Sequence, residues 1–185
     1  MHVLSKLHEV HESSFIKDEN DYNIYANYTH KLKQRYHSYN YIQQFNEAYY
    51  YYKKIYKQLK LYEQNENGSI SVIHGDPVFT NILIDTKNNI KFIDMRGLLG
   101  TTCTIFGDRW YDYAKIYQSL CGYDHILHNC KLKETDLKWK KLFEEYVEQK
   151  FSKAIMVFIR LITKSLLFTL IPLHEKYQQD FYKLM

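Results

Sequence analysis

The sequence predicts an α+β domain that is mainly helical, and three observations lead to this prediction. Short runs rich in isoleucine and valine lie close together, at Ile70–Ile73, Ile82–Ile84 and Ile90–Ile93. The stretches on both sides of these runs repeat apolar residues at three- and four-residue steps, a pattern typical of amphipathic helices. The chain has 185 residues, of which 45% are hydrophobic, and this is enough to bury one core. We therefore expect residues 1–185 to form a single domain.

The N-terminal part of the chain is expected to be helical. Leu4, Leu7 and His11 share one face of a first helix, and histidines in such a position are more often packing residues than metal ligands. After it, we expect a polar loop at Asp18–Asn27. Two helices are expected to follow, at Tyr28–Tyr39 and Gln43–Gln64. The last of these helices is rich in tyrosine and lysine, and it could be a platform for nucleic acid. We prefer a structural interpretation, with tyrosines toward a core and lysines in solvent, and expect no nucleic-acid partner.

The C-terminal part is also predicted to be helical. The first expected helix runs over Arg109–Leu120, with Asp108 as its N-cap. The second begins at a cap at Thr135 or Asp136 and ends at Lys150. Two more are expected over Phe151–Ile171 and His174–Leu184. The third of these is apolar enough to resemble a membrane span, but Lys153, Arg160 and Lys164 interrupt it. We therefore expect a core helix and no membrane association.

The β-rich stretch holds the residues with the clearest chemical potential. A loop after the first run carries Asp76 and Asn81, and the third run ends at Asp94. Phosphoryl transfer needs one carboxylate near the acceptor hydroxyl and oxygen ligands that hold Mg²⁺ against the triphosphate. Asp76 suits the first task, and Asn81 and Asp94 suit the second. A kinase catalytic loop has an aspartate, then an asparagine five residues later, and then an apolar strand that ends in aspartate. The same layout occurs here.

These motifs resemble a known family. HGDPVFTNILID, followed by IKFID and GDRWYDYAK, is similar to the aminoglycoside phosphotransferase and choline kinase family, which has a protein kinase-like fold. The sequence departs from the expected pattern at three positions. Val78 stands where many family members carry histidine, and Arg109 replaces the usual proline. Arg96 stands where protein kinases have glycine. None of these changes removes a residue that the chemistry requires.

The resemblance implies a role for each matched residue. Asp76 corresponds to the catalytic base, and Asn81 and Asp94 to the ligands of Mg²⁺ and hence of Mg²⁺-ATP. His74 and Gly75 match the entry to the catalytic loop, Asp112 matches the aspartate that supports this loop from behind, and Asp108 supports the following helix. The fold implied is the C-terminal lobe of a kinase-like protein, with a small β-hairpin region that carries the catalytic loop. The acceptor implied is a hydroxyl of a sugar-like or amino-alcohol small molecule. For a cationic acceptor, Glu144, Glu145 or Glu148 of the C-terminal helices are possible contacts.

The N-terminal ATP-binding lobe of such a kinase is not recognisable in this sequence. The first glycine is Gly68, so no glycine-rich phosphate loop precedes the catalytic loop, and no strand offers the lysine of that lobe. We expect either a phosphotransferase that uses a separately encoded N-terminal lobe, or a non-catalytic binding subunit or truncated remnant. A metal-dependent hydrolase built on His74, Asp76 and Asp94 is a third interpretation.

Composition limits the cellular setting only broadly. The formal net charge of +4 allows an anionic ligand without indicating nucleic acid. The three cysteines, Cys103, Cys121 and Cys130, form no C-x-x-C pair, and the opening residues do not resemble a signal peptide. We therefore expect reduced thiols and a cytoplasmic location.

Overall fold

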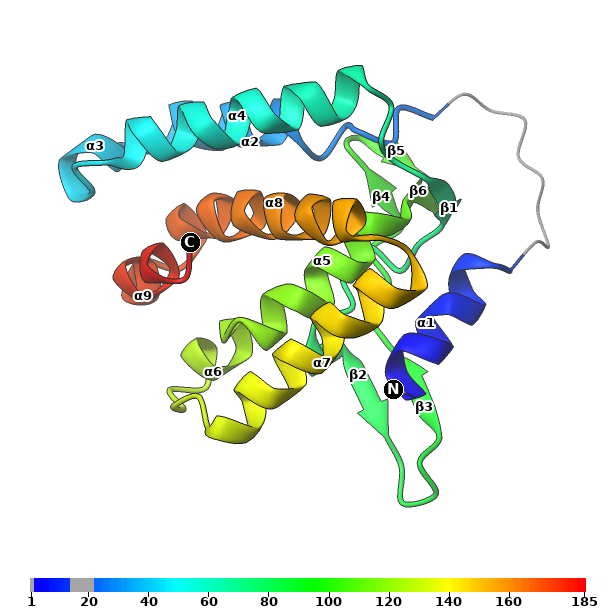
Figure 1. The fold of residues 1–185 in the computed structure, drawn as a ribbon. Helices are drawn as coiled ribbons and strands as arrows, with labels where there is room; N and C mark the ends of the chain where they lie inside the picture. Colours follow the sequence, from blue (N-terminus) through cyan, green and yellow to red (C-terminus); the bar gives the residue numbers. More distant parts are fainter. Residues whose placement is uncertain (1, 14–21) are drawn as a thin grey trace.

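The computed structural model describes residues 2–13 and 22–185, and it is mainly helical with few short strands (Figure 1). The α-helices are α1 (His2–His11), α2 (Thr29–Ser38), α3 (Tyr41–Gln44), α4 (Ala48–Gln64), α5 (Arg109–Leu120), α6 (Tyr123–Leu127), α7 (Glu134–Lys150), α8 (Lys153–Leu170) and α9 (Gln178–Lys183). Three 3₁₀ turns lie at Phe79–Asn81, Ile171–Leu173 and Glu175–Tyr177. Part of the polar loop expected over Asp18–Asn27, residues 18–21, lies outside the described residues.

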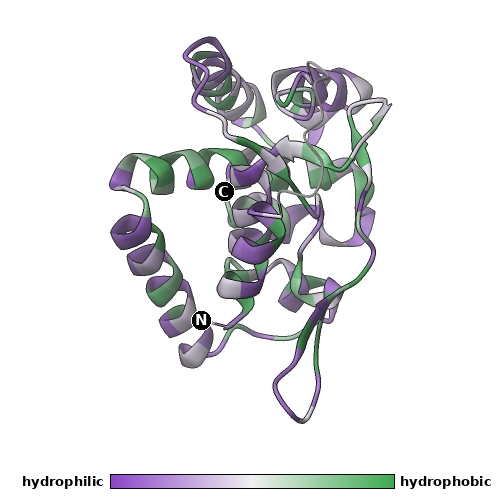
Figure 2. Cartoon of the chain, turned by 90° about the vertical axis from the view of Figure 1, so that its right-hand side faces the viewer, coloured by the Kyte–Doolittle hydropathy of each residue, from purple (hydrophilic) through white to green (hydrophobic). Residues whose placement is uncertain are grey.

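The strands form three separate antiparallel pairs rather than one sheet. β1 (Ile70–Val72) pairs with β6 (Phe106–Asp108), β2 (Ile82–Ile84) with β3 (Ile90–Phe92), and β4 (Leu98–Leu99) with β5 (Thr102–Cys103). The pairing of β1 with β6 brings the start of the Asp76 loop beside the start of α5. The β2–β3 hairpin projects from the helical body and ends in a hydrophilic tip (Figure 2).

The segment between Asp94 and α5 contains short strands that no β-type run in the sequence predicted. β4 and β5 lie within it, and β6 lies at its end. These strands are only two or three residues long, so they carry almost no periodic signal. β4 and β5 pair with each other across a short turn, and β6 pairs with β1, which is far away in the sequence.

Helix α8 lies at the centre of the core and packs against α4, α5, α7 and α9. It is the one helix of the described residues that is long and apolar enough to cross a membrane, and 56% of its most apolar 18-residue stretch is buried inside the protein. Its first turn is capped by Ser152, whose hydroxyl accepts from the amide of Ile155 at 3.2 Å. The interior is rich in tyrosine, and Tyr28, Tyr41, Tyr62 and Tyr113 are almost completely buried.

The long helix expected over Gln43–Gln64 is interrupted in the structure. α3 ends at Gln44, and Phe45 adopts an extended backbone with φ −140°. The buried ring of Phe45 stacks on Tyr182 of α9 at 4.4 Å between centroids. Burying this aromatic side chain favours a break that helical periodicity alone does not reveal.

The start of α7 also differs from the expectation. Neither Thr135 nor Asp136 is the N-cap, because the helix begins at Glu134 after Lys133. Asp136 instead accepts a hydrogen bond from the backbone amide of Lys133 at 2.7 Å. This places the carboxylate in the third helical position, where it still satisfies a free amide at the helix start.

Candidate functional site

The loop that carries Asp76 is held in place by backbone bonds at both ends. The amide of Ile73 donates to the carbonyl of Ile105 at 2.8 Å, and the amide of Arg96 donates to the carbonyl of His74 at 2.9 Å. Gly75 has φ +81°, and a Cβ atom there would lie 2.8 Å from the Cβ of Arg96. Glycine is therefore required at position 75, both by the backbone conformation and by the close approach of residue 96.

Asp112 supports this loop from the side of α5. It is fully buried, and its carboxylate accepts from the amides of His74 at 2.7 Å and Gly75 at 2.8 Å. The ring of His11, on α1, contributes a third contact of 3.1 Å from Nε2 to Asp112 Oδ2. A buried carboxylate is stable when donors surround it, and this one has two backbone amides and an imidazole. The contact between Asp112 and the loop is the one that the sequence predicted.

Asp108 stabilises a different part of the same region. It is the N-cap of α5, as predicted, and accepts from the amide of Trp110. It also accepts from the hydroxyls of Tyr28 at 2.6 Å and Tyr62 at 2.5 Å and from the amide of Ser69 at 3.0 Å. Burial raises the pKa of Asp108, although these four donors favour its charged form. Asp108 thus joins the N-terminal helices to α5.

Asp76 lies at the edge of the loop, where its side chain is 40% exposed. Its Oδ1 atom is 2.9 Å from Nζ of Lys115, whose own side chain is only 11% exposed. Burial lowers the pKa of Lys115, but Tyr111 and Asp76 raise it more, so the net shift is upward. Lys115 therefore remains charged and orients the Asp76 carboxylate.

Asn81 and Asp94 come together through the β2–β3 hairpin. The amide of Ile93 donates to the carbonyl of Asn81 at 3.0 Å, so Asn81 lies across from the residue that precedes Asp94. The side-chain Nδ2 of Asn81 donates to the carbonyl of Asp76 at 2.9 Å, which leaves its Oδ1 free to accept another partner. Asp94 is exposed and has φ +57°, a left-handed conformation that is uncommon for any residue other than glycine.

Oxygen atoms of this kind suit Mg²⁺. Mg²⁺ commonly uses one or two protein carboxylates or amides and completes its shell with water and substrate phosphates. Among residues 2–13 and 22–185, no group of three His, Cys, Asp or Glu residues is placed to hold a metal ion. His74 is buried, and its Nδ1 accepts from the amide of Asp76 at 3.3 Å. The Nδ1 atom of His74 thus takes part in the loop structure, and its buried Nε2 has no hydrogen-bond partner within the described part of the protein.

The sequence analysis missed two residues of this site. Lys115 lies three residues after Asp112, on the same face of α5, and this spacing was a usable signal. His11 was recognised only as a packing residue. Its contact with Asp112 joins residues 101 positions apart, and no local pattern predicts it.

Of the acidic residues suggested for a cationic acceptor, Glu144 and Glu145 pair with other side chains, and no partner is seen for Glu148 among the residues that the structure describes. Glu144 bonds to the hydroxyl of Tyr117, and its Oε2 lies 2.9 Å from Arg160. Glu145 pairs with Lys141 at 3.8 Å. A large apolar cavity of about 460 Å³ lies between α1, β2, α5 and α7, and neither Asp76, Asn81 nor Asp94 lines it. The candidate site is thus an open edge of the protein and separate from this cavity.

Comparisons with protein-family models, with curated proteins and with solved structures found no match for this chain.

Proposed function

We propose that this chain is the C-terminal lobe of a kinase-like phosphotransferase that moves the γ-phosphate of ATP to a hydroxyl of a small molecule. The observation that carries the proposal is the linked placement of Asp76, Asn81 and Asp94. One hydrogen bond joins Asn81 to the backbone of Asp76, and another joins it to the residue before Asp94. The segments that carry the base and the two metal ligands of the motif are therefore held together by hydrogen bonds of Asn81.

Each residue has a distinct task in this proposal. Asp76 accepts the proton of the acceptor hydroxyl, and its exposed edge leaves room for that hydroxyl. Asn81 Oδ1 and the Asp94 carboxylate are the Mg²⁺ ligands. Bound Mg²⁺ would neutralise charge on the transferred phosphate. Asp112 and His11 keep the loop rigid, which preserves the position of Asp76 during the reaction.

The metal and nucleotide part of the proposal can be tested by thermal unfolding. Mg²⁺-ATP is expected to raise the melting temperature, because a ligand that binds only the folded state stabilises it. Asp94→Asn is expected to abolish this shift. Asp180→Asn, an exposed aspartate on α9, serves as the matched control and should keep it. An equal shift in all three proteins would refute the assignment of Asp94.

The chemical step needs a separate measurement. Asp76→Asn is expected to keep the Mg²⁺-ATP shift and to lose roughly 10²–10⁴-fold in phosphotransfer, the usual contribution of a general base. The assay follows ³²P transfer from ATP to a panel of hydroxyl compounds. Transfer at the unchanged rate by Asp76→Asn would exclude this residue as the base.

A second candidate is a lobe that functions only with another polypeptide. Met95 and Leu98, which follow Asp94, expose large apolar side chains to solvent at 45% and 41%. A separately encoded N-terminal lobe could cover them and complete the nucleotide site. In that case, the isolated chain shows no shift with Mg²⁺-ATP, and the shift returns when the partner is added.

A further inference from the structure

Three cationic side chains converge on one buried phenol beside the candidate base. Tyr111 lies on the first turn of α5 and is only 3% exposed. Nη1 of Arg96 donates to its hydroxyl at 3.1 Å, and Nζ of Lys115 lies 6.0 Å from its ring centroid. Lys31, half-buried on α2, is the third positive charge that acts on Tyr111. Three residues before Lys31, the ring of Tyr28 packs 6.0 Å from the ring of Tyr111.

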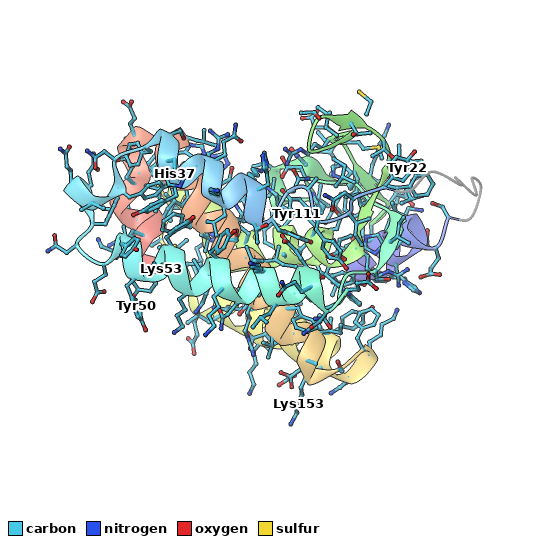
Figure 3. The ribbon with its side chains drawn as sticks, turned by 90° about the horizontal axis from the view of Figure 1, so that it is seen from above. Tyr22, His37, Tyr50, Lys53, Tyr111 and Lys153 are labelled. Carbon is cyan, nitrogen blue, oxygen red and sulfur yellow. The ribbon has the colours of Figure 1, made fainter. Side chains whose placement is uncertain are left out.

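Figure 3 shows where Tyr111, the phenol at the centre of this cluster, lies. Tyr111 is labelled at the end of α2 that faces the strands, between the layer of α2 and α4 and the strand region. Residues from three separate parts of the chain therefore meet here. We refer to Lys31, Arg96, Lys115 and the hydroxyl of Tyr111 as the cation cluster.

The charges of the cation cluster are not balanced. Burial raises the pKa of Tyr111, but Lys31, Lys115 and Arg96 lower it more, so the net shift is downward. Asp76 is the carboxylate that acts on this phenol in the opposite direction. The three positive charges thus outweigh Asp76 in their effect on the buried Tyr111.

Lys31 experiences this imbalance directly. Attraction to Tyr111 raises its pKa, but burial and repulsion from Arg96, Lys115 and Arg35 outweigh that effect and lower it. Like charges held together in a partly buried place are unfavourable unless an anion joins them. An anionic ligand would relieve the repulsion among all the cations at once.

The location of the cluster indicates which ligand it serves. Lys115 contacts Asp76 directly, and both act on Tyr123 of α6. The cluster therefore adjoins the base on the side of α5 and α6, whereas Asn81 is joined to the residue before Asp94 through the β2–β3 hairpin.

We propose that the cation cluster binds a phosphate group carried by the acceptor. Arginine and lysine together with a phenol hydroxyl supply the donors that a tetrahedral oxyanion requires. The acceptor is then a sugar-like alcohol that already bears a phosphate. This identification rests on the proposed function, whereas binding of phosphate by the cluster does not. It also disfavours an amino-alcohol acceptor, because a cationic group would be repelled here.

Phosphate binding is tested without Mg²⁺ or nucleotide. Inorganic phosphate, titrated against chloride at constant ionic strength, is expected to raise the melting temperature of the wild type. Lys31→Met should lose this shift. Lys33→Met, an exposed lysine on the same helix, should retain it. Equal phosphate shifts in Lys31→Met and Lys33→Met would overturn the proposal.

A second variant provides a test of the cluster if Lys31→Met does not fold. Tyr111→Phe removes only the hydroxyl, and it is expected to weaken phosphate binding several-fold while the protein retains its near-ultraviolet circular dichroism. Unchanged phosphate affinity in both Tyr111→Phe and a folded Lys31→Met would exclude the cluster as the binding site.

The assignment to the acceptor is tested separately from phosphotransfer. Glucose 6-phosphate is expected to shift the melting temperature more than inorganic phosphate does, and glucose should give no shift. Asp94→Asn should respond as the wild type does, whether or not phosphotransfer is ever observed. Competition between Mg²⁺-ATP and inorganic phosphate for the cluster would show that it holds nucleotide phosphates, and this outcome would overturn the acceptor assignment.

Discussion

The two sides of the Asp76 loop are built in opposite ways. Behind the loop, the carboxylate of Asp112 is fully buried and accepts from two amides and the ring of His11. In front of it, Asp76 is exposed, Asp94 has a strained backbone, and Lys31 is held among other cations. On the rear side, the carboxylate has its hydrogen-bond partners within the protein. On the front side, like charges lie near one another and the backbone of Asp94 is strained. Such a contrast is typical of a rigid support behind a ligand site.

The largest expected effect concerns the rear side. Asp112→Ala leaves the amides of His74 and Gly75 and the ring of His11 without an acceptor in a buried place. Each buried unpaired donor costs about 1–3 kcal/mol, so the free energy of unfolding should fall by about 3–5 kcal/mol. Urea denaturation measures this change. Asp180→Ala, at an exposed site, should change it by about 0.5 kcal/mol or less. A similarly small effect of Asp112→Ala would mean that the rear side is not the rigid support described here.

A second prediction concerns Asp108, the other buried carboxylate at the start of α5. Tyr62→Phe removes one of its four donors and should cost about 1–3 kcal/mol. Because burial raises the pKa of Asp108, the folded protein keeps its proton at pH values where the unfolded chain has lost it. Asp108 therefore contributes to the free energy of unfolding at pH values below its ordinary pKa of 3.8. This contribution is lost as the pH rises through the raised pKa of the folded protein.

The pH dependence gives this prediction a direct measurement. Loss of a donor that favours the charged form raises the pKa of Asp108 further. In Tyr62→Phe, the decline in the free energy of unfolding should therefore extend to higher pH than in the wild type. Urea denaturation at several pH values between 3 and 7 follows both curves. Parallel curves would show that Tyr62 does not control the ionisation of Asp108.

A third prediction tests the front side with another buried charge. Lys115→Met should lower the free energy of unfolding by about 1 kcal/mol at most, or raise it, because an apolar side chain of similar length replaces a buried ammonium. The Oδ1 atom of the abandoned partner, Asp76, is buried, but its side chain as a whole is 40% exposed. A loss as large as that of Asp112→Ala would show that the front side carries stability too. The comparison of the two sides would then fail.

The same contrast explains what could be predicted from the sequence. The helices at Arg109–Leu120 and near the C-terminus follow apolar periodicity, and the cap at Asp108 and the contact of Asp112 with the loop follow motif spacing. The break at Phe45 and the pairing of β1 with β6 depend on partners far away in the sequence. Short-range patterns contain no information on such contacts.

The site itself divides in a similar way. Asp76, Asn81 and Asp94 belong to one continuous stretch, so a motif could identify them. The cation cluster draws Lys31 from α2, Arg96 from the segment after β3 and Lys115 from α5. Each is an ordinary basic residue in its own local sequence. The contact between the ring of Tyr28, just before α2, and the ring of Tyr111 on α5 brings these parts of the chain together.

The smallest expected effect uses the strain at Asp94. Its φ of +57° suits glycine better than aspartate, so Asp94→Gly should raise the free energy of unfolding by about 0.5–1 kcal/mol. Asn88, at the hairpin tip with φ +62°, provides the matched control, and Asn88→Gly should give a similar gain. Urea denaturation measures both changes.

The two glycine variants should differ in ligand binding. Asn88→Gly is expected to keep the thermal shift with Mg²⁺-ATP, and Asp94→Gly is expected to lose it. A residue that costs stability where it stands, and whose removal abolishes binding, is retained for its carboxylate rather than for the fold. If Asp94→Gly instead destabilised the protein, the Asp94 carboxylate would be part of the structure, and the front side would resemble the rear side.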